Sequence, residues 1–379
     1  MYPVCAANPA NVRFNCKMDT DLKILALPLY GIGDVLMATP ALKNIKEKLP
    51  SSRLTFLHMF KTTRDVLAGN PNVDENIHFP FLAAGKLASA KFIMGLRGKY
   101  DVAINFYPSN RRDYNLASFL SGCPVRIGHT YVKHNFREMN FLKNRTLRED
   151  DELHNVEENI RLLDFLGIKC PMPYPLEIFL TGAEDEEASR FLAENGIDEK
   201  EKTPLIGFHP GTSAFKEHTN KRWPSKKFSE LIDSIAELSP HSRFLIFGGP
   251  EESGLKNEIK QGCAKGSLVY PVERPGIRQT AAVMKKCRLF ISNDSGLMHL
   301  AAALRLPTVG IFGPTNQKWV GPWECPSRVV RNSDVHCGPC FRYSPASLAC
   351  EKKYDFKCLQ GITVAQMLEA VKGLVKILK

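Results

Sequence analysis

The segment 288–315, RLFISNDSGLMHLAAALRLPTVGIFGPT, restricts the fold of this chain more than any other stretch. Residues 288–292 and 308–312 are apolar runs of strand length, and residues 297–304 between them have the length of a short helix. Residues 293–296 supply turn and N-cap side chains. Short buried strands that alternate with helices are typical of a parallel sheet, so we expect an α/β fold.

The helix predicted at 297–304 begins at a possible anion site. With Ser295 as N-cap, its first N–H groups are free, and open α/β sheets bind ligands at the carboxyl ends of their strands. Four apolar side chains share one helical face and can cover the sheet: Leu297, Leu300, Ala301 and Leu304. His299 points nearly the opposite way, toward a cleft or solvent. The segment predicts a phosphorylated ligand, although many units of this kind bind nothing.

The residue order of this segment resembles the signature of glycosyltransferase family 9, the ADP-heptose:lipopolysaccharide heptosyltransferases. In that family an Asp-Ser/Thr-Gly-Leu-x-His segment lies against the donor. The matching residues here are Asp294, Ser295, Gly296, Leu297 and His299. The resemblance extends from Lys23 to the C-terminus, through GIGDVLMATPALKNIKEKLP, HNVEENIRLLDFLGI, HPGTSAFKEHTNKRWP and FGGPEE in the expected order.

The length of the chain predicts two domains. Its 379 residues, 44% hydrophobic and 24% charged, have an ordinary globular composition but are too many for one core. The expected parts are a flexible extension at 1–21, a domain at 22–168, a proline-containing linker at 169–183, a domain at 184–362 and a C-terminal helix at 363–379. The resemblance implies that the first domain binds the acceptor and the second binds the nucleotide sugar.

Both halves show β-α alternation. Strands are expected at 22–28, 53–59, 76–79, 101–106, 125–128, 205–209, 244–247 and 268–272, in addition to those of segment 288–315. Residues 129–152 are polar and weakly patterned, which predicts an excursion or mobile loop. Two doubly wound, Rossmann-like α/β domains facing each other across a cleft form the GT-B arrangement, which the resemblance also implies.

The net charge of +11 predicts an anionic partner: nucleic acid, a membrane surface or a phosphorylated substrate. No nucleic-acid-binding module is recognisable, so nucleic acid is not expected. An anionic glycolipid at a membrane fits both the charge and the resemblance. No stretch has the length of a membrane span, and the N-terminus lacks a secretory pattern. We expect a cytoplasmic protein, with peripheral association at the inner face of the inner membrane.

The turn after the first predicted strand contains Gly31, Gly33 and Asp34. It fails the test for a dinucleotide fingerprint, because Leu36 occupies the third glycine position and no acidic residue follows the second strand. Asp34 is placed either to cap the helix or to serve as a base. In the family this turn carries an aspartate that acts as the catalytic base, and Asp34 matches it. Gly31 and Gly33 are assigned to the acceptor side.

The loop HPGTSAFKEHTNKRWP after the strand at 205–209 suits a diphosphate, although a solvated basic loop is the alternative. Its donor-site candidates are Gly211, Thr212, Ser213, Lys221 and Arg222. In the family, a lysine just before the Trp-Pro pair contacts the donor phosphates. Lys221 is the better match, and Arg222 is the alternative. Gly248 and Gly249 follow another strand and would let the backbone approach the nucleotide, or would form a simple turn.

Four late cysteines predict a structural zinc site: Cys337, Cys340, Cys350 and Cys358. Buried free thiols or disulfides are the alternatives. The Asp19-x-Asp21 pair precedes the first strand and is treated as chance. Since cations and helix dipoles can stabilise a leaving diphosphate, the resemblance implies that catalysis requires no metal or other cofactor.

The resemblance implies an inverting glycosyltransferase that moves heptose from ADP-heptose to the inner core of lipopolysaccharide. Asp34 would deprotonate the acceptor hydroxyl, and Lys221 would stabilise the departing ADP. Two other classes remain open, a nucleotide-sugar epimerase of the same fold and a non-catalytic protein that binds nucleotide sugar or carbohydrate.

Overall fold

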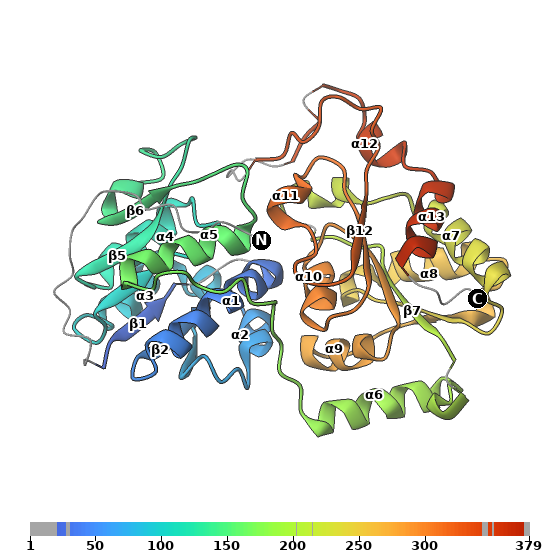
Figure 1. The fold of residues 1–379 in the computed structure, drawn as a ribbon, viewed down its shortest axis with the longest axis horizontal. Helices are drawn as coiled ribbons and strands as arrows, with labels where there is room; N and C mark the ends of the chain where they lie inside the picture. Colours follow the sequence, from blue (N-terminus) through green and yellow to red (C-terminus); the bar gives the residue numbers. More distant parts are fainter. Residues whose placement is uncertain are drawn as a thin grey trace. The chain divides into compact units, whose positions relative to one another are not determined.

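The computed structural model describes residues 21–27, 31–201, 203–213, 215–342, 348–350 and 352–374. The extension predicted at 1–21 lies outside these ranges except for Asp21. The described residues form two compact units that divide between Tyr174 and Pro175 (Figure 1). Residues 171–181, inside the segment predicted as a linker, have no regular secondary structure.

The first unit contains a six-stranded sheet in which every described strand pair is parallel. Its strands are β1 (Lys23–Ala26), β2 (Arg53–His58), β3 (Glu75–His78), β4 (Val102–Ile104), β5 (Val125–Thr130) and β6 (Arg145–Arg148). The order β3-β2-β1-β4-β5-β6 reverses direction between β1 and β4. This reversal is the topological switch point at which doubly wound sheets bind ligands.

Helices join the strands of the first sheet. They are α1 (Ile32–Lys48), α2 (Lys61–Leu67), α3 (Phe81–Met94), α4 (Arg112–Leu120) and α5 (Asn155–Arg161), with the short 3-10 helices η1 (Asn140–Leu142) and η2 (Leu162–Leu166). Helix α1 continues through Pro40, which has no N–H to donate to the carbonyl of Leu36. The Thr39 hydroxyl donates to that carbonyl instead, at 2.7 Å, which explains why the helix tolerates proline there.

The prediction of an excursion or mobile loop at 129–152 is wrong in part. This stretch contains the end of β5, the 3-10 helix η1 and the sixth strand, β6. Asn140, which is fully buried, donates to the Asn110 side chain at 2.8 Å and to the Asn135 carbonyl at 3.1 Å. Such buried side-chain bonds fix an irregular backbone without apolar periodicity, so the hydrophobic pattern gave no sign of them.

The second unit has another six-stranded sheet with the same winding, and its described strand pairs are all parallel. Its strands are β7 (Leu205–His209), β8 (Arg243–Ile246), β9 (Val269–Pro271), β10 (Leu289–Asn293), β11 (Thr308–Ile311) and β12 (Ser327–Val330). The order β12-β11-β10-β7-β8-β9 places its switch point between β7 and β10. Two such halves confirm the predicted α/β fold of GT-B type.

The helices of the second unit follow its strands. They are α6 (Gly182–Glu194), α7 (Ser225–Leu238), α8 (Ser253–Gly262), α9 (Ile277–Lys285), α10 (Gly296–Ala303), α11 (Gln317–Val320), α12 (Lys357–Gln360) and α13 (Val364–Leu374), with the 3-10 helices η4 (Phe215–Lys221) and η5 (Pro250–Glu252) near the strand ends. Helices α7 and α13 lie side by side over the sheet and contribute to one apolar core (Figure 1). Their buried residues recur at helical spacing, as in Phe228, Leu231, Ile232 and Ile235.

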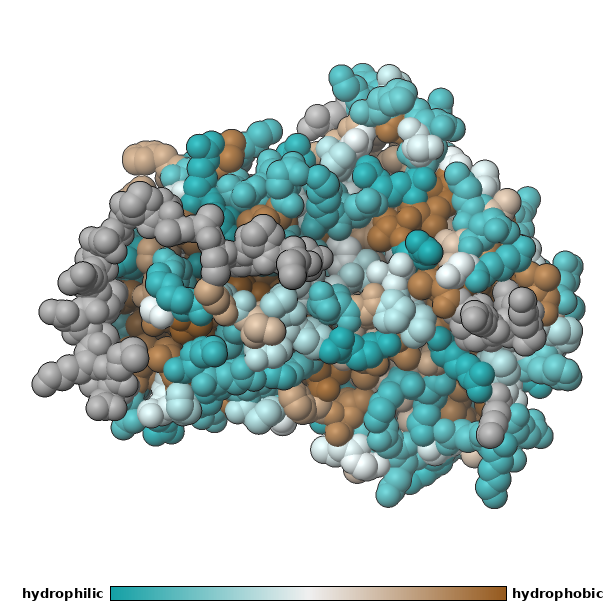
Figure 2. Space-filling view, viewed as in Figure 1, coloured by the Kyte–Doolittle hydropathy of each residue, from teal (hydrophilic) through white to brown (hydrophobic). Residues whose placement is uncertain are grey.

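The face of the protein in Figure 2 is mostly hydrophilic, with smaller apolar patches between polar side chains. Of the helices in the described ranges, none is both long and apolar enough to cross a bilayer.

Candidate active site

The switch point of the second sheet brings two predicted donor segments together. Strand β7 ends at His209 and β10 ends at Asn293, and Ser292 pairs with His209 in parallel register. The loops that follow these strands therefore start side by side. One contains Gly211, Thr212 and Ser213, and the other contains Asp294, Ser295 and the start of α10.

Asn293 connects these two loops through hydrogen bonds of its side chain. This role was not predicted from the sequence. Its fully buried side chain accepts a hydrogen bond from the Trp223 N–H at 3.0 Å and donates to the Pro210 carbonyl at 2.6 Å. Because both ends of the basic loop 210–223 are bound to this one amide, the position of Lys221 within the loop is tied to β10.

Lys221 forms a buried ion pair with Asp294, with 2.7 Å between Nζ and Oδ2. The two side chains are only 11% and 8% exposed. Burial alone would raise the pKa of Asp294, but the charge and the hydrogen bond of Lys221 outweigh it and lower the pKa below the ordinary value. Lys221 Nζ also lies 5.5 Å from the ring centre of Phe341. The predicted phosphate-binding lysine and the predicted donor aspartate thus form one charged unit.

His299 does not lie in solvent, so that part of its predicted position is wrong. Its side chain is on α10 and only 4% exposed, and Nδ1 finds no hydrogen-bond partner among the described residues. Burial lowers the pKa of His299 to about 4, although the charge of Asp294 opposes the shift. The imidazole is therefore neutral at physiological pH. Its free ring nitrogen leaves one polar atom available beside the Lys221–Asp294 pair.

The predicted apolar face of α10 also needs correction. Leu300 and Ala301 are fully buried as expected, but Leu297 and Leu304 are only half-buried and Met298 is fully buried. The prediction assumed a helix covered on one side, whereas this helix is covered on most sides. Ser295 is the N-cap residue, but its hydroxyl contacts His209 and not the helix backbone.

A second set of polar side chains, His209, Glu252 and Arg222, connects the end of β7 to the turn after β8. His209 Nδ1 lies 2.8 Å from the Ser295 hydroxyl, and Nε2 lies 3.2 Å from Glu252 Oε2. Arg222 donates to Glu252 Oε1 at 3.1 Å and to the Thr212 carbonyl at 2.8 Å. Burial would raise the pKa of Glu252, but His209, the Gly249 N–H and Arg222 lower it. Sequence reasoning missed His209 and Glu252, whose only signal was their position, His209 at the end of β7 and Glu252 in the turn after β8.

Glu252 also explains two of the predicted glycines. A Cβ at Gly211 would lie 1.7 Å from Glu252 Oε1, so no side chain fits there. Gly248 has φ of +159° and sits against the same carboxylate, which accepts a hydrogen bond from the Gly249 N–H at 3.1 Å. These glycines make room for Glu252. Their contact with a nucleotide stays a prediction.

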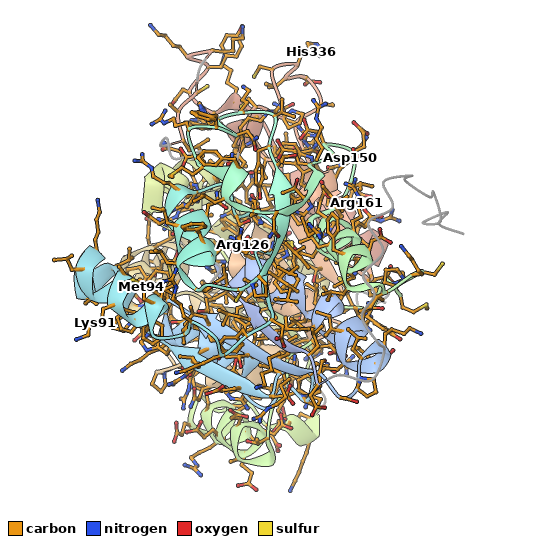
Figure 3. All side chains as sticks on the ribbon, turned by 90° about the vertical axis from the view of Figure 1, so that its left-hand side faces the viewer. Lys91, Met94, Arg126, Asp150, Arg161 and His336 are labelled. Carbon is orange, nitrogen blue, oxygen red and sulfur yellow. The ribbon has the colours of Figure 1, made fainter. Side chains whose placement is uncertain are left out.

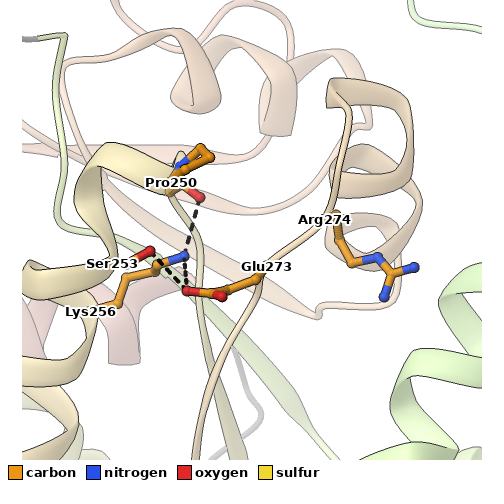
Figure 4. A pocket seen from close by; sticks show the side chains of 6 residues that line it. Pro250, Ser253, Lys256, Glu273 and Arg274 are labelled. Carbon is orange, nitrogen blue, oxygen red and sulfur yellow. Dashed lines mark hydrogen bonds and ion pairs between the residues drawn. The ribbon is translucent and has the colours of Figure 1, made fainter.

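A pocket of about 230 Å³ opens beside this turn (Figure 4). Its lining residues are Gly248, Pro250, Ser253, Lys256, Glu273 and Arg274. Lys256 is 1% exposed, donates to the Val272 carbonyl at 3.1 Å and pairs with Glu273 at 3.3 Å. In Figure 4 the Arg274 guanidinium points away from that pair. The pocket therefore combines fixed charges with a cation that is not part of the Lys256–Glu273 pair.

Asp34 lies in the first unit, in the first turn of α1 after β1. Its Oδ2 accepts a hydrogen bond from the Gly31 N–H at 3.1 Å, so the carboxylate does make the capping contact that was the alternative to a base. The side chain is half-buried, and Gly33 is buried in the same turn. Asp34 thus lies at the switch point of its sheet. Its role as base, and the acceptor role of Gly31 and Gly33, stay predictions.

The four late cysteines form no disulfide in the described part of the chain, and Cys358 lies within electrostatic range of the other three. Burial raises the pKa of the Cys358 thiol to about 11, with smaller contributions from Cys340, Cys337 and Cys350. Within the described ranges, however, no three His, Cys, Asp or Glu side chains are arranged to hold a metal ion. The four cysteines are thus near one another, but their described side chains are not arranged as a metal site.

Comparison with known proteins agrees with the arrangement of both sheets. The chain is 26% identical over 324 residues to lipooligosaccharide heptosyltransferase 2 of Haemophilus ducreyi. The aligned part covers 83% of this chain and 89% of the relative. A family 9 glycosyltransferase structure from Veillonella parvula matches with a TM-score of 0.74 and 24% identity, over 93% of this chain and 97% of that one. The E. coli heptosyltransferase WaaC with ADP-2-deoxy-2-fluoro heptose matches with a TM-score of 0.66 and 18% identity, over 93% and 100%.

The family model of Glycosyltransferase family 9 (heptosyltransferase) matches residues 89–349, which include the predicted donor segments after β7 and β10. This match spans more than half of the 379 residues and confirms the resemblance seen in the sequence. The protein is a glycosyltransferase, and the chain belongs to glycosyltransferase family 9, the heptosyltransferase family.

Proposed function

We propose that this enzyme transfers heptose from ADP-heptose to the inner core of lipopolysaccharide. The observation that carries the proposal is the Lys221–Asp294 pair at the N-terminus of α10, at the switch point of the second sheet. The name of the Haemophilus ducreyi relative supports the acceptor class, and the ligand named with the E. coli structure supports the donor class.

The second unit would bind the donor. The Lys221 ammonium has three N–H donors, and its hydrogen bond to Asp294 uses one of them. The others are available to diphosphate oxygens, as are the free N–H groups at the start of α10. Pairing with Lys221 also offsets the charge of Asp294, which would otherwise repel the diphosphate. His299, neutral and with Nδ1 free, adds a polar contact for the sugar or phosphate.

The predicted donor roles of Gly211, Thr212, Ser213, Arg222, Gly248 and Gly249 belong to the same proposal. Arg222 is engaged by Thr212 and Glu252, so it would position the loop, and Lys221 would meet the phosphates. The pocket lined by Gly248 at the turn after β8 offers space for the nucleoside part of the donor.

The first unit would present the acceptor, with Asp34 as the base. In an inverting displacement the acceptor oxygen attacks the anomeric carbon and its proton passes to the Asp34 carboxylate. The bond from the anomeric carbon to the diphosphate oxygen breaks, and ADP leaves with both bonding electrons. The expected boundaries at 22–168 and 184–362 are part of this assignment. Because the acceptor is a glycolipid, we also propose peripheral association with the cytoplasmic face of the inner membrane.

ADP release tests the proposed function directly. Purified protein with ADP-heptose and an inner-core acceptor is expected to release ADP and to add one heptose to the acceptor, as measured by mass spectrometry. Without acceptor, release should fall to the level of slow hydrolysis. Conversion of the donor without acceptor would support an epimerase instead, and donor binding without any ADP release would support a binding protein.

A structural zinc ion at Cys337, Cys340, Cys350 and Cys358 completes the proposal. Metal binding would replace the thiol protons, and the bound cation would offset the charges of the thiolates that hold it. The metal would contribute to folding of the C-terminal segment without a role in transfer.

Elemental analysis of protein never exposed to chelator is expected to find about one equivalent of zinc. Cys358→Ser should lower that content, whereas the matched control Cys123→Ser, a buried free cysteine of the first unit, should not. Less than about a tenth of an equivalent in the wild type would count against the site.

A further inference from the structure

Helix α3 (Phe81–Met94) carries apolar side chains that no described part of the chain covers. Leu82, Leu87 and Met94 are 68%, 90% and 43% exposed. The helix is kinked at Gly85, where φ is +77°, so Leu82 lies in the short part before the kink. In the part after the kink, Leu87, Lys91 and Met94 are spaced i, i+4 and i+7, so they share one side of the helix. Figure 3 shows Lys91 and Met94 together at the outer side of the first unit.

The opposite side of α3 is firmly packed. Ile93 is buried in an apolar cluster of the first sheet, and Phe92 stacks on Phe79 with 4.1 Å between ring centres. Since one side of the helix anchors it to the sheet, the exposed leucines and methionine are held in place on the surface. An exposed apolar surface rimmed by polar side chains is typical of an interaction site.

The charged side chains of the segment that contains α3 are all cationic. Residues 76–100 contain no Asp or Glu, but they contain Lys86, Lys91, Arg97 and Lys99, all of which are exposed. Arg97 packs against Gly122 at the end of α4, where Phe119 is 45% exposed beneath the Arg126 guanidinium. The apolar and cationic surface therefore continues from α3 onto α4.

We propose that this α3 surface, made by Leu82, Leu87 and Met94 with Lys86, Lys91 and Arg97, binds an anionic lipid bilayer. A helix with alternating apolar and cationic side chains can lie in the headgroup region, where its apolar side chains enter the acyl boundary and its cations meet lipid phosphates. This surface belongs to the first unit, whereas the predicted donor residues belong to the second. The inference rests on the proposed function in one respect: a glycolipid acceptor would bring the enzyme to a membrane.

A second copy of the chain is a poorer occupant for this surface. If two α3 surfaces met about a twofold axis, the cations of one would face the same cations of the other, and no carboxylate of residues 76–100 could neutralise them. Anionic lipid supplies the missing charge. Charge complementarity thus favours the bilayer.

Vesicle sedimentation of the full-length protein tests the inference. Wild-type protein should bind vesicles with about 30% phosphatidylglycerol at least tenfold more strongly than neutral phosphatidylcholine vesicles, and salt should weaken the binding. Leu87→Asp combined with Met94→Asp should lower the partition coefficient at least tenfold. Each of Lys86→Glu and Lys91→Glu should lower it roughly fivefold or more.

Leu238→Asp on α7 is the matched control, because Leu238 is 44% exposed in the other unit and should leave lipid binding within about twofold of the wild type. Equal binding of neutral and anionic vesicles, or binding that the α3 variants do not change, would overturn the inference. The inference would also be overturned if light scattering showed the wild type to be a dimer and the Leu87→Asp, Met94→Asp variant to be a monomer. Transfer to a water-soluble core oligosaccharide should be the same in this variant as in the wild type. If neither protein transferred heptose to this oligosaccharide, the proposed function would be contradicted, but the proposal that the α3 surface binds lipid would not.

Discussion

Asp34→Asn is expected to lower kcat by roughly 100-fold to 10,000-fold, the usual cost of losing a general base. Asparagine keeps an oxygen that can accept the hydrogen bond from the Gly31 N–H, but it cannot accept the proton of an acceptor hydroxyl. The variant should therefore keep its melting temperature and its ADP affinity. Steady-state kinetics with saturating acceptor, calorimetry with ADP and thermal melting measure the three quantities.

Asp34→Ala is the companion variant, because it removes both the capping contact and the base. It should lose as much activity as Asp34→Asn and about 0.5–2 kcal/mol of stability in addition. If the asparagine variant kept more than about a third of the wild-type kcat while chemistry limits the rate, Asp34 would be only a cap. The capping contact in the structure makes this comparison necessary, since stability alone cannot separate the two roles.

The fold was predictable where burial produces a simple pattern. The strands β7 and β10 are continuous buried runs, and the turn residues after them mark the carboxyl edge of the sheet. The strands β6 and β12 were missed, because RTLR and SRVV are short and only partly buried edge strands. An edge strand pairs on one side, so its sequence is less constrained toward apolar residues.

The candidate site was predictable only in part, because its contacts join residues that are far apart in the sequence. Lys221 and Asp294 were identified from a family pattern, but their ion pair joins residues 73 positions apart. The contacts of His209 with Ser295 and Glu252 span 86 and 43 positions. No local periodicity reports such convergence, which is created by the parallel pairing of β7 with β10 on one side and with β8 on the other. His299 was placed by a helical wheel, which cannot show that α10 is covered on most sides.

Lys221→Met is expected to weaken ADP binding by roughly 10-fold to 150-fold, because one charged hydrogen bond to phosphate is worth about 1.5–3 kcal/mol. The variant also leaves the Asp294 carboxylate buried without its cation, so the protein should be less stable at neutral pH. In the wild type the lowered pKa of Asp294 stabilises the fold above its ordinary value of 3.8, and this contribution disappears as pH falls below that value. The difference in melting temperature between variant and wild type should therefore narrow as pH falls below about 4.

The double variant Lys221→Met, Asp294→Asn separates binding from stability. Removing the buried carboxylate charge should restore most of the melting temperature and its normal pH dependence, whereas ADP affinity should stay low because no ammonium meets the phosphates. Arg222→Met is the comparison for the neighbouring cation and should affect ADP affinity less, since Arg222 is bound to Thr212 and Glu252. If Lys221→Met kept its ADP affinity and Arg222→Met lost it, the phosphate contact would belong to Arg222. In that case the Lys221–Asp294 pair would serve only to fix the loop after β7 against α10.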